Sequence, residues 1–346
     1  MVAVIMTNNI IFDDIGSYPL PTGISREWME NAILTQDIDS YRIIIKAMKQ
    51  KIKAGVHVPN YPQFQDMNKQ FLFYINHPDF AEQPFLVKED CAIIKELKPI
   101  EIIAGDYFEE TKEKLKIRIC VTGPIELYLK QFGATNYLDI LLQISKSVDR
   151  FIKNSLKNAR YIDINIVSID EPSIGINPEI KFEDADLIDA LSIAAQTCRS
   201  KDIDTEIHLH SPLHYNLVTQ TPINIIGVES AANPSYLDLI DKKDLKETDT
   251  FLRVGVARTD IYGMTAVLNE KYGINVWKEM DKLKEIITDM ETPEVIKKRL
   301  EKAYKIFGDC ITHAGPDCGL SAWPNQELAF KLLENTGKGI KEFFRY

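Results

Sequence analysis

Residues 162–172 read IDINIVSIDEP, an isoleucine-rich run that ends in two acidic residues. Short β-branched runs of this kind, bounded by turn residues, are typical of strands buried on both faces of a parallel sheet. Seven further segments share the pattern and are therefore candidate strands. They are IFDDIGS (11–17), AGVHVPN (54–60), IRICVTGP (117–124), TEIHLHS (205–211), INIIGVES (223–230), FLRVGVA (251–257) and DCITHAG (309–315).

Longer amphipathic stretches separate these segments, and the clearest lie at 25–53, 134–159, 183–200 and 278–307. Strands that alternate with helices predict an α/β fold, and eight such units in 346 residues predict a single (β/α)8 TIM barrel spanning 1–346. Residues 66–116 form a longer insert, in which IEIIAGDYF and LKIRIC are predicted to pair as a hairpin.

Charge and composition restrict the partners of the chain. Its net charge is −10 and its pI is about 5.3, which argues against nucleic acid and against an anionic membrane surface, because both need clustered Lys and Arg. No apolar run is long enough to span a membrane, and MVAVIMTNNIIF at the start lacks the features of a signal peptide. We therefore expect a cytoplasmic protein with a small-molecule partner.

Five cysteines, an odd number without a close pairing motif, are expected to be reduced, and one of them is a candidate ligand. In a TIM barrel the active site lies at the carboxyl ends of the strands. The polar residues whose side chains could bind a metal or take part in catalysis fall late in their predicted strands, and Cys318 follows the eighth predicted strand. The others are Ser17, Asp170, Glu171, His208, His210 and Glu229.

His208 and His210 are two residues apart on a predicted strand, so their side chains share a face. Imidazole, carboxylate and thiolate are the usual zinc donors, and together with Glu229 and Cys318 the histidines would make a four-ligand set. The other interpretation is that both histidines bind backbone groups at a strand end. The spacing alone leaves both open.

The order of five motifs adds a resemblance. IGSYP (15–19), IDEPS (169–173), HLH (208–210), VES (228–230) and PDCGL (316–320) follow one another as in the catalytic domain of the cobalamin-independent methionine synthase family. IDEP and PDCGL are the specific matches, whereas GPIELY (123–128) and YPQFQDMNKQF (61–71) are weaker. The chain lacks the family's N-terminal half and is most similar to its short, single-barrel archaeal-type members, which implies a barrel of the methionine synthase and uroporphyrinogen decarboxylase-like type.

The resemblance implies a zinc ion held by His208, His210, Glu229 and Cys318. It also implies that Asp170 receives the homocysteine ammonium and that Asp170 and His210 are the residues on which catalysis depends. The substrate carboxylate would lie against backbone N–H groups of Ile15, Gly16 and Ser17. Near Tyr61 the family has an acidic residue that contacts the amine, so Tyr61 is a candidate substrate contact here.

The reaction implied by the resemblance is transfer of a methyl group to the homocysteine thiolate to give methionine. Where the family has His-x-Cys this chain has His-x-His, so the ligands sum to −2 and balance Zn²⁺. We hypothesise that the thiolate is then held more tightly and is less reactive, which favours an activated donor, methylcobalamin or a methylcorrinoid protein, over a methylated folate or pterin.

Other functions stay open from the sequence. The acceptor could be a thiol other than homocysteine. His-x-His at a strand end also occurs in metal-dependent amidohydrolases, but on their first barrel strand, with further ligands that have no counterpart here. A non-catalytic barrel that binds an amino acid is the remaining alternative, and bound zinc would argue against it.

Overall fold

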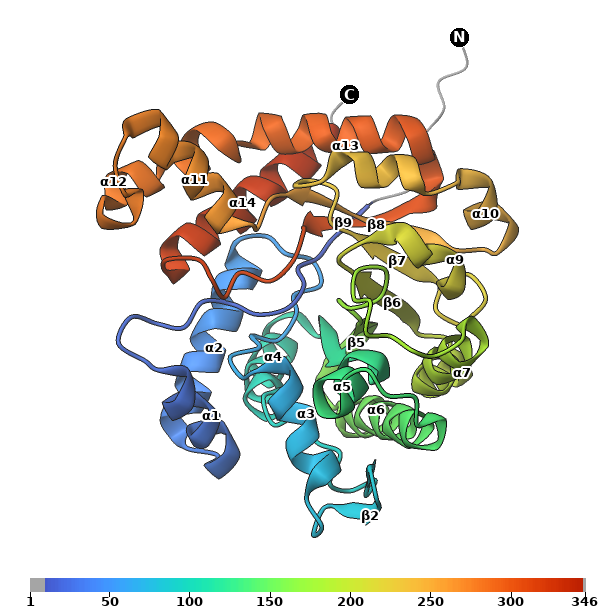
Figure 1. The fold of residues 1–346 in the computed structure, drawn as a ribbon. Helices are drawn as coiled ribbons and strands as arrows, with labels where there is room; N and C mark the ends of the chain where they lie inside the picture. Colours follow the sequence, from blue (N-terminus) through green and yellow to red (C-terminus); the bar gives the residue numbers. More distant parts are fainter. Residues whose placement is uncertain (1–9, 345–346) are drawn as a thin grey trace.

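Seven parallel strands form one curled sheet in the order β1-β9-β8-β7-β6-β5-β4, with helices packed around its outside (Figure 1). The computed structural model describes residues 10–344; residues 1–9, most of the N-terminal stretch considered for a signal peptide, lie outside it. The strands of this sheet are β1 (Ile11–Phe12), β4 (Leu115–Thr122), β5 (Ile162–Asp170), β6 (Asp204–Leu209), β7 (Ile225–Val228), β8 (Phe251–Ala257) and β9 (Ile311–Pro316).

The predicted helical stretches are helical but more divided than expected. The stretch 25–53 forms two helices, because Gln36 adopts the left-handed conformation with φ of 58° and ends the first. No helix of the described residues is long and apolar enough to cross a membrane. The helices before β6 are α1 (Arg26–Thr35), α2 (Ile38–Lys53), α3 (Met67–Asn76), α4 (Leu97–Thr111), α5 (Pro124–Phe132), α6 (Leu138–Asn158), α7 (Asp184–Ala194) and α8 (Gln196–Lys201). Those after β6 are α9 (Tyr215–Val218), α10 (Lys242–Glu247), α11 (Ile261–Tyr272), α12 (Met280–Leu283), α13 (Pro293–Phe307) and α14 (Gln326–Phe343).

The predicted second strand, 54–60, is not a strand, so the described sheet has seven strands rather than eight. The segment makes only two isolated parallel bridges, Asp13↔Val58 on one side and Asn60↔Arg118 on the other. Gly55, the second residue of the segment, has φ of 91°, and Pro59 has no N–H to donate to a ladder. These two residues explain why regular pairing does not develop there.

The predicted hairpin within 66–116 is wrong. IEIIAGDYF lies inside α4, whose buried residues Leu97, Ile100, Ile103 and Ala104 repeat at the spacing of one helix face. LKIRIC forms the start of β4, which pairs in parallel with β5. The insert does contain a small antiparallel pair, formed by β2 (Ala81–Gln83) and β3 (Leu86–Val87).

Contacts across the sheet show how strongly it curls. Arg118 in β4 forms an ion pair with Asp13, which follows β1 at the opposite edge of the sheet. Arg118 Nη2 also lies 2.6 Å from Glu206 Oε2, and Arg253 Nε lies 2.9 Å from Asp13 Oδ1. All four side chains are fully buried, so the concave face encloses a layer of paired charges.

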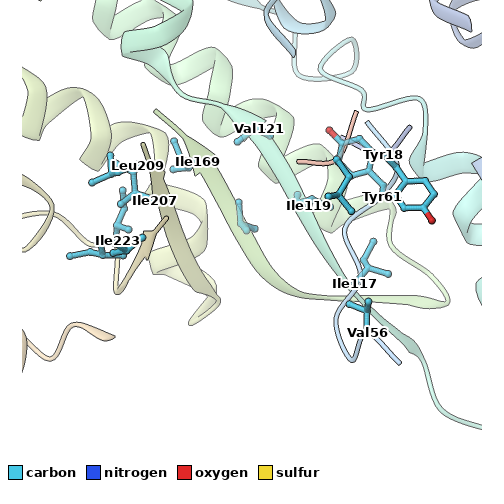
Figure 2. Packing of buried hydrophobic residues seen from close by; sticks show 14 of the residues in the cluster. Tyr18, Val56, Tyr61, Ile117, Ile119, Val121, Ile169, Ile207, Leu209 and Ile223 are labelled. Atoms are coloured by element: carbon cyan, nitrogen blue, oxygen red, sulfur yellow. The ribbon is translucent and has the colours of Figure 1, made fainter. Parts of the chain in front are cut away.

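The two faces of the sheet differ in composition. On the outer face, Ile117, Ile119 and Val121 of β4 belong to the main hydrophobic cluster under the helices (Figure 2). A second, smaller apolar cluster joins Val58, Ile166 and Ile225. Because side chains alternate along a strand, Arg118 and Cys120 point to the face opposite Ile117 and Ile119. The concave face is therefore where polar groups gather.

Candidate metal and substrate site

Four side chains converge at the carboxyl ends of three strands. His208 is in β6 and His210 just after it, Glu229 follows β7 and Cys318 follows β9. One ligand atom of each lies within 4.8 Å of those of the other three. Glu229 Oε1 lies 3.6 Å from His208 Nε2 and 3.5 Å from His210 Nε2, and Cys318 Sγ lies 3.8 Å from His210 Nε2. The residues predicted as ligands are thus brought together and could hold a metal ion.

His208 has the environment of a ligand rather than of a structural histidine. Its side chain is buried, and neither ring nitrogen has a hydrogen-bond partner among the residues that the structure describes. Buried polar atoms are nearly always paired, so two orphaned ring nitrogens require an explanation. Burial lowers the pKa of His208 to about 4, which keeps the ring neutral and its lone pairs available at neutral pH. A metal ion at this position fits all three observations.

Burial disfavours the charged forms of the two acidic ligands, Glu229 and Cys318. Burial raises the pKa of Glu229 and raises that of the Cys318 thiol well above its ordinary value. Burial also lowers the pKa of His210. A divalent cation would act in the opposite direction on the carboxyl and thiol groups, since a coordinating thiol is deprotonated outright. Two neutral imidazoles, one carboxylate and one thiolate suit zinc in charge and in donor type.

Asp317, which the sequence analysis did not single out, fixes two of the ligand-bearing loops. Its carboxylate accepts hydrogen bonds from the backbone N–H groups of Ala231, at 2.9 Å, and Ala232, at 2.8 Å, just beyond Glu229. An added Cβ at Gly255 would lie 1.8 Å from Asp317 Oδ1, so only glycine leaves room for this carboxylate. Asp317 stands beside Cys318 in the PDCGL motif, which was the available signal.

The IDEP motif places two carboxyl groups with different partners. Asp170 ends β5, and its Oδ1 accepts a hydrogen bond from Ser168 Oγ at 2.6 Å. Glu171 is fully buried and accepts from the backbone N–H groups of Ile125, at 2.8 Å, and Glu126, at 2.9 Å, in the first turn of α5. Glu171 is therefore a structural cap of α5, while Asp170 stays at the strand end.

The loop Ile15–Ser17 packs directly on the loop that carries Cys318. Gly16 has φ of 67°, and the carbonyl of Ser17 accepts a hydrogen bond from the N–H of Leu320 at 2.6 Å. A Cβ added at Gly319 would lie 2.8 Å from the backbone nitrogen of Ser17. The two loops touch through glycine backbone, which brings the predicted carboxylate-binding turn next to a predicted metal ligand.

Tyr61 is placed differently from a substrate contact. Its side chain is fully buried, and its hydroxyl donates to the Cys120 carbonyl at 2.8 Å and accepts from Gln63 Nε2 at 3.2 Å. Tyr61 has no accessible surface for a substrate to contact in this structure. Through its hydrogen bond to the Cys120 carbonyl it stabilises β4 instead. The aromatic residues near it, Phe64 and Phe71, are likewise part of the core.

Comparisons with known proteins agree with the fold. No protein-family model matches the chain, and no curated protein sequence is significantly similar to it. Among solved structures, a B12-independent methionine synthase from Shewanella sp. W3-18-1, in complex with selenomethionine, has a TM-score of 0.62 at 13% identity and covers 97% of this chain and 98% of its own. A methyltransferase from Methanosarcina mazei has a TM-score of 0.57 at 11% identity, covering 97% and 94%. A protein assigned as a vitamin-B12-independent methionine synthase from Listeria monocytogenes gives 0.51 at 14%, covering 95% and 98%.

These likenesses run over almost the full length of the chains on both sides. The chain therefore shares the fold of B12-independent methionine synthase structures, as the motif order predicted. At these identities the likeness concerns the fold, and the site has to be argued from the side chains themselves.

Proposed function

We propose that the protein is a zinc-dependent methyltransferase that makes methionine by transferring a methyl group to the sulfur of homocysteine. The observation that carries this proposal is the convergence of His208, His210, Glu229 and Cys318 within 4.8 Å, on a fold shared with methionine synthases. We also propose that the chain is one catalytic unit, a (β/α)8 barrel in which the bridged segment 54–60 takes the place of the eighth strand.

The metal site would take its zinc ion from solution, and the bound ion would supply the positive charge that removes the proton from the substrate thiol. The protein's own residues would hold and orient the reactants. Only 3% of the His208 side chain is exposed, against 39% for His210, so His210 is the ligand that faces the open side of the site. A substitution at His210 should therefore affect the substrate side of the site most directly.

Homocysteine would be positioned by the groups around the metal site. The backbone of Ile15, Gly16 and Ser17 would receive its carboxylate, since the turn leaving a strand can present N–H groups to an anion. Asp170 would receive its ammonium group. We keep Tyr61 in the substrate site only as an indirect support, through its hydrogen bond to the β4 backbone. Fixing both ends of the amino acid directs its sulfur toward the ligand cluster, which converts methyl transfer into an oriented reaction.

For the methyl donor we propose methylcobalamin or a methylcorrinoid protein. With Glu229 and Cys318 ionised, the ligand set carries −2 and neutralises a zinc ion, so the substrate thiolate would be bound tightly and would be a weaker nucleophile. A donor whose methyl group is already activated compensates for that weakness. A methylated folate or pterin is the alternative donor, and a different small thiol is the alternative acceptor.

The test is methyl transfer by the purified protein, with zinc content measured in parallel. Methylcobalamin and homocysteine are incubated with the zinc-loaded protein, demethylation is followed by absorbance and methionine is assayed. We expect turnover that is lost in Cys318→Ser and kept in Cys91→Ser, because Cys91 is also partly buried but lies outside the cluster. The same assay with methyl-tetrahydrofolate, and with other thiols, separates the alternatives. A protein that binds no zinc under any condition would contradict the proposal.

A further inference from the structure

The residue before the turn Ile15–Ser17 belongs to a buried ion pair that the proposed function does not use. Lys51 Nζ, in the last turn of α2, lies 2.7 Å from Asp14 Oδ2, and the two side chains are 0% and 4% exposed. We infer that Lys51 and Asp14, together with Asn60, are positioning residues that hold this turn in the shape that receives the substrate carboxylate. This inference rests on the proposed function, which is what gives the turn a ligand.

Asn60 connects the ion pair to the turn. Its backbone N–H donates to Asp14 Oδ1 at 2.9 Å, and its carbonyl accepts a hydrogen bond from Lys51 Nζ, also at 2.9 Å. Its side-chain amide donates to the carbonyl of Gly16 at 2.9 Å. Asn60 is fully buried, so these bonds join α2, the bridged segment 54–60 and the turn in one network inside the protein.

Lys51 also contacts the residue that follows the turn. Its Nζ lies 5.3 Å from the centre of the Tyr18 ring, which is within the range of a cation–π contact, and Tyr18 directly follows Ser17. The Tyr18 hydroxyl donates to the carbonyl of Gln326, the first residue of α14, at 3.3 Å. The network therefore contacts the chain before, within and after the turn, at residues 14, 16 and 18.

The network lies where regular strand pairing is missing. In a complete barrel the backbone groups of an eighth strand would bind the two neighbouring strands. Here Asn60 makes a single bridge to Arg118, and its N–H and C=O groups bind the side chains of Asp14 and Lys51. A buried ion pair adds little net stability, because the cost of desolvation offsets most of the attraction. What the pair does supply is a set of directional hydrogen bonds, and these determine where the turn lies.

The turn faces the site with backbone groups. Gly16 and Ser17 are half-buried, and no acceptor for the Ser17 N–H is found within residues 10–344, so this donor is available to an anion. The Ser17 carbonyl accepts from the N–H of Leu320, two residues after Cys318. A turn that shifts when the network is lost would misplace its N–H groups, and a misplacement of about 1 Å from a distant substitution can lower an oriented reaction about 100-fold.

The test compares two ligands that differ only in the carboxylate. Binding of methionine and of methioninol, in which a hydroxymethyl group replaces the carboxylate, is measured by calorimetry on the zinc-loaded protein. Asn60→Ala removes the donor to Gly16 and keeps the ion pair, since Asn60 binds Asp14 and Lys51 through its backbone. Lys51→Met removes the charge from a side chain of similar length. We expect each substitution to weaken methionine binding by about 10- to 100-fold, the range for losing a hydrogen bond to a charged group, and to change the methioninol affinity by less than about twofold.

Asp149→Ala is the matched control, because it also removes hydrogen bonds between a side chain and a distant segment. Asp149, in α6, accepts from the N–H of Thr197 at 2.7 Å and from its hydroxyl at 2.9 Å. This substitution should lower Tm and leave both affinities unchanged. Equal weakening of both ligands by Asn60→Ala would mean that the network only maintains the fold and would overturn the inference, as would unchanged methionine binding. A wild-type protein that binds neither ligand would refute the proposed function itself, whereas those two results refute the positioning role alone.

Discussion

Zinc should stabilise the protein against heat, and Cys318→Ser should remove most of that stabilisation. The reason is that only the folded chain brings the four ligands within 4.8 Å, so zinc binds the native state and shifts the unfolding equilibrium. Without metal the substitution should matter little. The Cys318 sulfur lies 3.8 Å from His210 Nε2 and also contacts the Glu229 carboxyl group, and a serine hydroxyl of similar size can keep both contacts.

The size of the effect follows from the length of the chain. An unfolding entropy of about 2.1 cal/mol/K per residue over 346 residues gives about 0.73 kcal/mol/K. Free zinc at 1,000 times its Kd stabilises by about 4.1 kcal/mol, which corresponds to a rise in Tm of about 5–6 °C. Changes to groups that merely orient ligands cost up to about 100-fold in affinity, so losing a ligand should cost at least that. At the same zinc concentration the variant would then gain only about 1.4 kcal/mol, or about 2 °C.

The assay is differential scanning calorimetry of metal-free and zinc-loaded protein at a fixed free zinc concentration, with Cys91→Ser as the control. Cys91→Ser should keep the full shift. Equal shifts in wild type and Cys318→Ser would show that zinc binds elsewhere and would refute the ligand assignment. The absence of any shift in the wild type at saturating zinc would refute the metal site.

Three other substitutions test the interior and the site. Arg118→Met should cost about 3–5 kcal/mol in urea unfolding, because it leaves the buried carboxylates of Asp13 and Glu206 without this cation; a loss below about 1 kcal/mol would contradict the ion-pair layer. Burial raises the pKa of Glu96 to about 7 from an ordinary 4.5, so the wild type loses stability as the pH rises through this interval. Glu96→Gln should therefore gain about 2.5 kcal/mol relative to wild type between pH 5 and pH 8, and a constant difference would disprove the buried titration. His210→Cys should transfer methyl faster or accept a methylated pterin, and an unchanged rate and donor range would remove the charge argument for a corrinoid donor.

Much of the fold was predictable because its signals are local. The strands from β4 onward are short β-branched runs between turn residues, and FLRVGVA matches β8 residue for residue. The position of the site followed as well, because parallel strands place their carboxyl ends at one edge. The two strand ends that bear His208, His210 and Glu229 could be identified by counting along the sequence, and the loop bearing Cys318 follows the last strand.

The predictions that were wrong or missing concerned features that depend on contacts between distant segments. Whether residues 54–60 pair as a strand depends on how the backbone at Gly55 and Pro59 fits between β1 and β4, the two edge strands of the sheet. Composition does not reveal this fit. IEIIAGDYF has strand-like residues, but its burial against neighbouring elements at helical spacing decides for α4. The role of Asp317 was overlooked because it depends on hydrogen bonds from the backbone of Ala231 and Ala232, both more than 80 residues away.

The distribution of charge on the concave face connects the fold to the chemistry. In the interior layer, two arginines face Asp13 and Glu206, so the charges balance and no ligand is needed there. At the strand ends the balance is lost, since Glu126 and Asp170 have no cation among the described residues and Glu229 contacts only histidines by ion pairing. A site with excess negative charge attracts cations and repels a thiolate. We therefore expect zinc to bind before homocysteine, because the metal is what turns the site from one that repels the reactive sulfur into one that holds it.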